Sequence, residues 1–389
     1  MRSVFKLWER EMAYLNSINK LLFASFLYTG LAGSALAATE FNANTFFPAT
    51  HPLAKHGYIE WADSLGKNSN GELKPKVFTG TVLLPARAGM SGVRDDIAQV
   101  GYHYSGYTPA ELPLSTAIQE LGFNYSDALV AAVANTDFNM NDPDLLAEWD
   151  NAGIIFGGGY STPPYNLMCK MPVTNLSELK GKRLRTNGNA LSRWAETVGA
   201  VPVNVPSSEM YQGIEKGTLD CALNVASDLK SRSLWDVAKH TTMAPLGIAW
   251  AGPMWGYNKD FWNGLSDNHK RLMLNENALA MAKLYIGYNA SIEEALSEAK
   301  DHGVSVYDPG NGMLASIKKF ADDNMSNVYD TAREKYAVSD PKALLGRFQS
   351  TVKKWEDLFS NVDRNNHEAI ASIIKAELFD KIDVASYGS

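Results

Sequence analysis

Between Leu179 and Asn224, the hydrophobic and polar positions alternate between the spacing of strands and the spacing of helices. Arg183 to Thr186 is a short extended run, and the Asn187-Gly188-Asn189 stretch after it contains residues that tolerate a positive φ. The next apolar residues recur at i, i+3, i+4 and i+7, the spacing of one buried helical face. They are Leu191, Trp194, Ala195 and Val198. Gly199 stands where the C-terminal cap of this helix is expected, so the pattern predicts a strand and then a helix.

The same rhythm continues to the end of the segment. Val201 to Val205 is a second apolar run, and Pro206 to Glu209 supply a cap residue and an acidic first turn for another helix. Leu219 to Val225 is a third strand. Ligands of open α/β sheets bind outside the carboxyl ends of the strands, where Arg185 and Asn224 would both lie. An arginine in such a place can hold a carboxylate through two parallel hydrogen bonds.

The order of short motifs in this segment resembles the substrate-binding proteins of TRAP transporters, the tripartite ATP-independent periplasmic type. The corresponding residues are Leu179-Lys180-Gly181, Arg185, Gly199-Ala200, Pro202-Val203, Ser208-Glu209-Met210-Tyr211, and Gly217 with Asp220. The resemblance covers roughly residues 40–310 and includes a further strand, Asp96 to Gly101, whose end borders the ligand in the family. It implies an α/β fold of the two-lobed, Venus-flytrap type. Each lobe would be a mixed sheet flanked by helices, with a long helix bracing both lobes.

The rest of the pattern can be divided between these two lobes. Strands are predicted at Phe41 to Pro48, Leu73 to Phe78 and Ile97 to Tyr104, and the Gly157 to Pro164 stretch is predicted to cross between lobes. We expect lobe I at 38–162 and 250–285, and lobe II at 163–249 and 286–310. Residues 311–389 are expected to form helices that pack on the lobes.

Two long helices are predicted after residue 260. Asp267 to His302 contains no proline and only one glycine, which predicts a helix far above the mean length of about 11 residues. Pro341 to Leu358 carries apolar residues on one face. This face is expected to pack on the lobes, and binding of another protomer is the alternative.

The first 37 residues read as a secretory signal peptide. Basic residues precede the apolar run Leu21 to Leu36, and cleavage is expected after Ala37. A membrane anchor is the alternative, but the run is interrupted by Gly, Ser and Thr and falls short of the ~20 apolar residues of a span. The net charge of −7 becomes −9 without residues 1–37, and no basic tract predicts nucleic-acid binding. We therefore expect a periplasmic protein with no direct membrane insertion after cleavage.

Cys169 and Cys221 are the two cysteines of the chain. In an oxidising periplasm such a pair is a disulfide candidate, and two buried thiols are the alternative. Because both cysteines fall on predicted strands of one sheet, the disulfide is favoured.

No motif in the chain predicts catalysis. None of the seven histidines forms a zinc-binding pattern, so no metal site is expected. Ser161 lacks the second glycine of a nucleophile elbow, and no Lys-Ser/Thr follows Gly157-Gly158-Gly159 to make a phosphate-binding loop. A catalytic pair of carboxylates from distant segments is an alternative that the sequence leaves open. We predict no catalytic residue and no cofactor.

The resemblance assigns roles to residues of the cleft. Arg185 would hold the ligand carboxylate, and Asn224 occupies the position of an asparagine that commonly contacts it. Leu223 and Cys221 stand where many members have Glu and Gly, which leaves the substrate open. Further cleft residues are expected at Tyr104, Tyr165, Asn166, Trp250 and Tyr257.

The sequence thus predicts an extracytoplasmic receptor for a small organic acid. The resemblance implies delivery to the small and large membrane subunits of a TRAP transporter. One clear arginine beside aromatic residues favours a monocarboxylate with an apolar or aromatic body. Alternatives are a receptor for an ATP-driven importer, a sensor, and an exported hydrolase.

Overall fold

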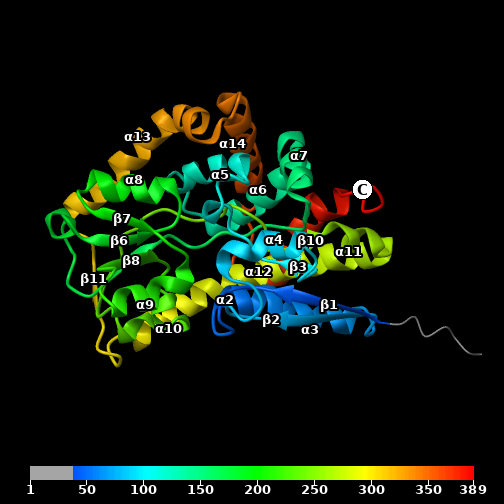
Figure 1. Ribbon diagram of the computed structural model, residues 1–389, viewed down its shortest axis with the longest axis horizontal. Coiled ribbons are helices and arrows are strands. Elements are labelled where there is room, and N and C mark those ends of the chain that lie inside the picture. The colour runs from blue at the N-terminus through cyan, green and yellow to red at the C-terminus, as the bar shows by residue number, and fades with distance from the viewer. Residues whose placement is uncertain (1–37) are drawn as a thin grey trace, which may run out of the picture. The chain divides into compact units, whose positions relative to one another are not determined.

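Two mixed β-sheets organise the chain (Figure 1). The structure is a computed structural model and describes residues 38–389, so the predicted signal peptide lies outside the described residues. Sheet A has the order β2-β1-β3-β10-β4; β1 runs parallel to β3, and β10 runs antiparallel to β3 and β4. Its strands are β1 (Thr39–Asn44), β2 (Leu73–Phe78), β3 (Val100–Gly101), β4 (Ile154–Phe156) and β10 (Gly256–Asn258). We call sheet A and its helices lobe I.

Sheet B has the order β11-β9-β5-β8-β6-β7, and we call it and its helices lobe II. β6 runs parallel to β7 and β8, whereas β5 runs antiparallel to β8 and β9. The strands are β5 (Asn166–Cys169), β6 (Arg183–Thr186), β7 (Val201–Asn204), β8 (Cys221–Asn224), β9 (His240–Thr242) and β11 (Ser305–Tyr307). Cys169 and Cys221 face each other in the β5–β8 register, with Cα atoms 4.0 Å apart, and a disulfide joins them.

Helices flank both sheets. The helices of lobe I are α2 (Pro52–Ala54), α3 (Glu60–Asn68), α4 (Gly89–Arg94), α5 (Pro113–Gln119), α6 (Ala128–Asn141), α7 (Pro143–Ala152) and α11 (Lys259–Gly264). A π-helical turn, Lys55–Ile59, joins α2 to α3. The helices of lobe II are α8 (Asn189–Thr197), α9 (Met210–Glu215) and α10 (Asp228–Ser231). No helix of residues 38–389 has the length and apolar character that a membrane crossing needs.

The predicted pattern around β6 is confirmed. α8 buries Leu191, Trp194 and Ala195, and Gly199 follows the helix at a φ of 75°, as a C-terminal glycine cap requires. Elsewhere two strands differ from the prediction. β1 ends at Asn44 instead of Pro48, and β3 comprises only Val100–Gly101 instead of Ile97 to Tyr104. The chain leaves β3 for the 3₁₀ turn Ser105–Tyr107, which places tyrosine rings between the lobes instead of in the sheet.

Two segments cross between the lobes side by side. The first, 157–165, connects β4 to β5, as predicted, and the second, 243–255, connects β9 to β10. Backbone hydrogen bonds join them, from Thr162 N to Ala249 O (2.9 Å) and from Tyr165 N to Gly247 O (2.8 Å). Every strand falls within the residue range expected for its lobe. The exact boundaries of the lobes stay a prediction.

The predicted long helix is confirmed as α12 (Asp267–Glu298), which contacts both lobes (Figure 1). On lobe I, Trp61 Nε1 of α3 donates to Asn277 Oδ1 (2.9 Å). On lobe II, Lys230 Nζ of α10 pairs with Glu294 (2.8 Å) and Glu298 (2.6 Å). α12 therefore braces the two lobes.

The C-terminal segment forms α13 (Asn311–Tyr336), α14 (Pro341–Leu358) and α15 (His367–Glu377). α13 is a second brace, because Gly310 N, just before it, bonds to Thr174 O of lobe II, whereas Tyr336 Oη at its end bonds to Glu120 of lobe I. The apolar face of α14 packs against α6, with the rings of Phe138 and Phe348 5.5 Å apart. α15 packs along α12. Within the described residues, the predicted stripe on α14 is core packing.

Candidate ligand-binding site

Arg185 lies in the interior of sheet B, where the lobes meet. β6 is paired on both sides, so Arg185 stands between Val203 of β7 and Ala222 of β8, and its side chain is fully buried. Its Nε donates to Val205 O (2.9 Å) and its Nη1 to Leu223 O (3.0 Å), at the ends of the two neighbouring strands. The sheet therefore holds the guanidinium at the carboxyl end of β6.

The third partner of Arg185 comes from lobe I. Arg185 Nη2 donates to Tyr107 Oη (3.2 Å), in the 3₁₀ turn after β3. All three acceptors are neutral, and no carboxylate of residues 38–389 lies within ion-pair distance of this arginine. A buried cation without a counter-ion is costly. A guanidinium has five N–H donors, so one donor on each Nη is left for an anion.

Six buried tyrosines lie in a group that includes Tyr107, the lobe I partner of Arg185, and we call them the tyrosine cluster: Tyr102, Tyr104, Tyr107, Tyr160, Tyr165 and Tyr288. The rings of Tyr104 and Tyr107 are 4.9 Å apart, and those of Tyr102 and Tyr160 are 5.1 Å apart. Burial raises the pKa of Tyr104 well above its usual value. Burial also raises the pKa of Tyr165 to about 12, although the charge of Arg185 opposes this shift. The phenols of Tyr104 and Tyr165 are therefore protonated at neutral pH.

Two of the phenols already accept hydrogen bonds and keep their own protons for other acceptors. Tyr107 Oη accepts from Arg185 and from Ser207 N (3.1 Å). Tyr165 Oη accepts from Asn187 Nδ2 (3.0 Å). The two phenol protons add to the two donors of Arg185, so the surroundings of this arginine are rich in donors and suit a carboxylate.

Asn224 and Asn166 stand opposite each other in the β5–β8 register. Asn224 Nδ2 donates to Asp228 Oδ2 (2.6 Å), and Asn166 Nδ2 donates to Ala244 O (3.2 Å). The amide of Asn224 thus belongs to a network around the buried carboxylate of Asp228. That carboxylate also pairs with Arg232 Nε (3.0 Å).

This network reaches across to lobe I through His51. The Nδ1 atom of His51 accepts from Leu53 N (3.1 Å), so its Nε2 carries the proton and faces Asp228 Oδ1 at 3.4 Å. Burial, and then the charge of Arg232, lower the pKa of His51 well below its usual value. The histidine is therefore neutral, and its contact with Asp228 is polar but not an ion pair.

A further polar contact between the lobes centres on Glu120, and we call it the Glu120 cluster. In lobe II, Asn189 Nδ2 and Arg193 Nη2 both donate to Glu120 Oε2 at 3.0 Å. Tyr336 Oη of α13 donates to Glu120 Oε1 (2.6 Å). This carboxylate is 1% exposed, so lobe I, lobe II and α13 meet at a charge-balanced point.

The structure does not bring Trp250 and Tyr257 to the surroundings of Arg185. The Trp250 ring packs against Tyr125 and Phe348, and Tyr257 stacks on Trp262 with ring centroids 4.9 Å apart. Both rings belong to the core of lobe I and the C-terminal helices, so their predicted role as cleft walls is not supported.

Sequence reasoning missed several residues that meet Arg185 and its neighbours. Tyr107 and Asn187 are the most direct, since one accepts from Arg185 and the other donates to Tyr165. A signal was present, because Tyr102, Tyr104 and Tyr107 stand in one short run and Asn187 follows Arg185 by two residues. Tyr160, Tyr288 and His51 come from distant segments, whereas Asp228 follows Asn224 by four residues, and no local pattern marks any of them.

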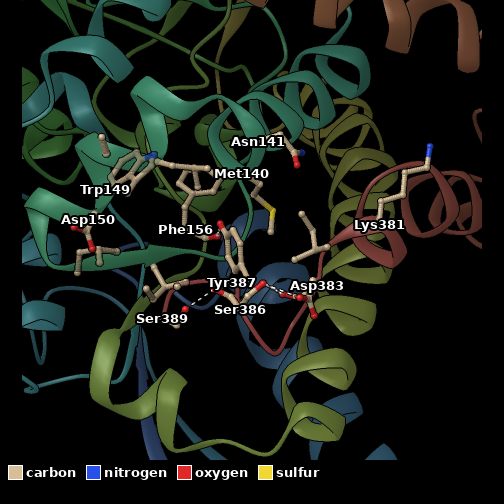
Figure 2. Close-up of a pocket in the computed structure, with 16 residues that line it drawn as sticks. Met140, Asn141, Trp149, Asp150, Phe156, Lys381, Asp383, Ser386, Tyr387 and Ser389 are labelled. Carbon is tan, nitrogen blue, oxygen red and sulfur yellow. Dashed lines mark hydrogen bonds between the residues drawn. The ribbon is translucent and has the colours of Figure 1, made fainter.

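A surface hollow of about 500 Å³ lies elsewhere, between α7, β4 and the C-terminal tail (Figure 2). Tyr387 Oη closes one side by donating to Phe156 O (2.7 Å). None of its lining residues belongs to lobe II, and none carries an unpaired buried polar atom. It lacks the chemistry that Arg185 offers. Among residues 38–389, no group of three His, Cys, Asp or Glu side chains could hold a metal ion.

Comparisons with known proteins agree with this arrangement. The model of bacterial extracellular solute-binding protein family 7 matches residues 43–332. The 2,3-diketo-L-gulonate-binding periplasmic protein YiaO of Escherichia coli is 26% identical over 279 residues, which are 67% of this chain and 78% of YiaO.

Two solved structures share the fold. One is a TRAP solute-binding protein from a marine metagenome, specific for aromatic acid ligands and bound to 3-hydroxybenzoate. It is 20% identical with a TM-score of 0.72, over 82% of this chain and 99% of the other. The other is DctP7, a Bordetella pertussis receptor that binds pyroglutamic acid. It is 23% identical with a TM-score of 0.66, over 80% and 100% of the chains. The predicted two-lobed α/β fold is confirmed.

Proposed function

We propose, from the premise that this chain belongs to bacterial extracellular solute-binding protein family 7, that it is a periplasmic receptor that delivers a small organic acid to a TRAP transporter. One observation carries the proposal. Arg185 is a fully buried cation that has three neutral partners and no carboxylate partner in the described residues. An anionic ligand would supply the missing charge.

In the proposed complex, the ligand carboxylate accepts from the two remaining Nη donors of Arg185. The phenol protons of Tyr107 and Tyr165 add two further donors. Arg185 comes from lobe II and Tyr107 from lobe I, so a bound carboxylate would contact both lobes. A ligand that contacts both lobes shifts the population toward the closed arrangement, through a hinge at the two crossing segments and the braces α12 and α13.

The ligand body would lie among the aromatic rings. The tyrosine cluster offers apolar ring faces with hydroxyl edges, and Arg185 supplies the positive charge. This combination favours a monocarboxylate with an apolar or aromatic body over a dicarboxylate. The aromatic-acid and pyroglutamate ligands of the structural neighbours support this class.

The first experiment is a binding panel. Thermal-shift screening, followed by isothermal titration calorimetry, would use benzoate, 3-hydroxybenzoate, mandelate, phenylacetate, pyroglutamate, succinate and malate. Any ligand raises the melting temperature with saturation. We expect monocarboxylates to bind more tightly than succinate or malate, and the opposite ranking would overturn the ligand class.

The second experiment removes the charge of Arg185. Arg185→Gln should weaken binding more than tenfold, because truncating one partner of a buried charged contact costs about 2–5 kcal/mol. The matched control is Arg183→Gln, two residues earlier on β6, where the arginine pairs with Asp220 (2.9 Å). The control should keep the affinity of the wild type. Equal affinity of the Arg185 variant would overturn the site.

Delivery to a TRAP transporter needs its own test. The purified protein would be added to liposomes that hold the small and large TRAP membrane subunits, with a labelled ligand from the panel. We expect uptake that requires an ion gradient and no ATP. Uptake only with an ATP-driven importer would move the protein to the alternative class.

A further inference from the structure

One buried acceptor beside Arg185 has no partner. Asn187 directly follows β6, is 5% exposed, and its Oδ1 makes no hydrogen bond with any residue of 38–389. Its Nδ2 donates to Tyr165 Oη (3.0 Å), and its carbonyl oxygen accepts from Tyr104 Oη (3.5 Å). A buried polar atom without a partner is costly, and native proteins rarely keep one without a use.

Asn187 and Arg185 share the same neighbours. Tyr165 accepts the hydrogen bond of Asn187, and the charge of Arg185 acts on the pKa of the same phenol. Tyr104, which donates to the Asn187 carbonyl, packs against Tyr107, the lobe I partner of Arg185. The free acceptor therefore stands at the edge of the same group of side chains that would receive the carboxylate.

The two ends of this group differ in their chemistry. Around Arg185 the free groups are donors: two guanidinium N–H groups and the phenol protons of Tyr107 and Tyr165. At Asn187 the free group is an acceptor. A ligand that satisfies both ends carries a carboxylate and, apart from it, a hydrogen-bond donor.

We propose that Asn187 Oδ1 accepts a hydrogen bond from a hydroxyl or N–H group of the ligand, so that the receptor selects carboxylates that carry such a donor. This inference rests on the proposed function. An analogue without the donor would leave Oδ1 buried and unpaired, and sites built to pair with a substrate hydroxyl or N–H discriminate strongly against such analogues.

The experiment compares matched pairs by calorimetry on the wild-type protein. Each carboxylate that binds in the panel is paired with the analogue in which the hydroxyl is replaced by hydrogen, or the N–H by CH₂. Examples are mandelate with phenylacetate, 3-hydroxybenzoate with benzoate, and pyroglutamate with 3-oxocyclopentanecarboxylate, its carbocyclic analogue. We expect the donor-bearing member to bind at least about tenfold more tightly.

Two variants locate the discrimination. Asn187→Ala should reduce the affinity ratio of a pair to about threefold or less, because it removes the acceptor. Tyr165→Phe is the control, since it removes the partner of Asn187 Nδ2 and leaves Oδ1 in place. It should weaken both members of a pair together and preserve their ratio. This ratio separates ligand recognition from a general loss of structure.

The outcomes separate this inference from the proposed function. If carboxylates bind through Arg185 but the two members of each pair bind equally, Asn187 has no such role and the receptor function stands. The inference is also overturned, with the receptor function intact, if the tightest ligand lacks a donor or if Asn187→Ala leaves the ratio unchanged. If no carboxylate binds, the proposed function fails, and this inference fails with it.

Discussion

The lobes meet at the Glu120 cluster and at Arg185, and these two buried polar groups differ in charge balance. In the Glu120 cluster, the carboxylate of lobe I meets the guanidinium of Arg193 from lobe II (3.0 Å). At the other position, Arg185 of lobe II meets only the neutral hydroxyl of Tyr107 from lobe I. The first group is complete within the chain, whereas the second lacks an anion.

This difference separates a structural contact from a binding site. Both arginines lie at the interface of the lobes, and the position of an arginine alone would not distinguish them. A balanced pair favours closure whether or not a ligand is present. An unbalanced cation favours closure only when an anion arrives, and this dependence is what a receptor needs.

The largest expected effect comes from unbalancing a buried pair. Asp228→Ala would leave Arg232, which is 7% exposed, without its carboxylate. We expect a loss of about 3–5 kcal/mol in the free energy of unfolding, measured with urea. Arg185→Gln, in protein refolded to remove copurified ligand, should change it by less than about 1 kcal/mol, since relief of an unpaired charge offsets the lost hydrogen bonds. Equal losses in both variants would make Arg185 a structural residue.

Acid should create a second buried cation without a counter-ion, this one in lobe I. His103 is 1% exposed, its Nδ1 has no partner in the described residues, and burial lowers its pKa to about 4. Its folded pKa lies below the usual value of 6.5, so its contribution to stability is complete above pH 6.5 and is lost as the pH falls toward 4. The loss amounts to about 3 kcal/mol.

The variant His103→Gln isolates this term. Its free energy of unfolding should fall less steeply than that of the wild type between pH 6.5 and 4, whatever its value at neutral pH. If the free energies of unfolding of the two proteins fell in parallel with pH, the pKa of His103 would not be lowered in the folded protein.

A smaller effect is expected from the Glu120 cluster. Glu120→Gln keeps an acceptor for Tyr336 but removes the charge that faces Arg193. Arg193 is 27% exposed, so solvent screens part of the pair, and we expect a loss of about 1–2 kcal/mol in the free energy of unfolding. Ligand affinity should fall because closure is less favourable, whereas the ranking of ligands should be unchanged. A changed ranking would place Glu120 in the binding site.

The sequence predicted the frame of the site better than its walls. β6, α8 and the carboxyl-end position of Arg185 followed from local spacing, because strand and helix periods are properties of neighbouring residues. The walls depend on which distant segments meet. Tyr160 and Tyr288 reach the cluster through a crossing segment and α12, which no local period specifies.

Charge balance was equally invisible in the sequence. The sequence does not show which arginine has a carboxylate partner. In the structure Arg183, Arg193 and Arg232 each have one, whereas Arg185 has none among the described residues. The motif residue Asp220 illustrates the same point. It belongs to the pattern that suggested a binding protein, yet it pairs with Arg183 and has a structural role.

The smallest expected effect comes from this last pair, and it compares two arginines of one strand. Arg183 stands two residues before Arg185 on β6, and its side chain is 43% exposed and bonded through Nε (3.0 Å) and Nη2 (2.9 Å) to Asp220. Solvent and salt screen such a pair, so Arg183→Gln should change the melting temperature by at most about 2 °C, and less at high salt. Ligand affinity should be unchanged, because the guanidinium of Arg183 already has its anion. If Arg183→Gln weakened binding as much as Arg185→Gln, the absence of a carboxylate partner would not be what makes an arginine of this strand a ligand contact.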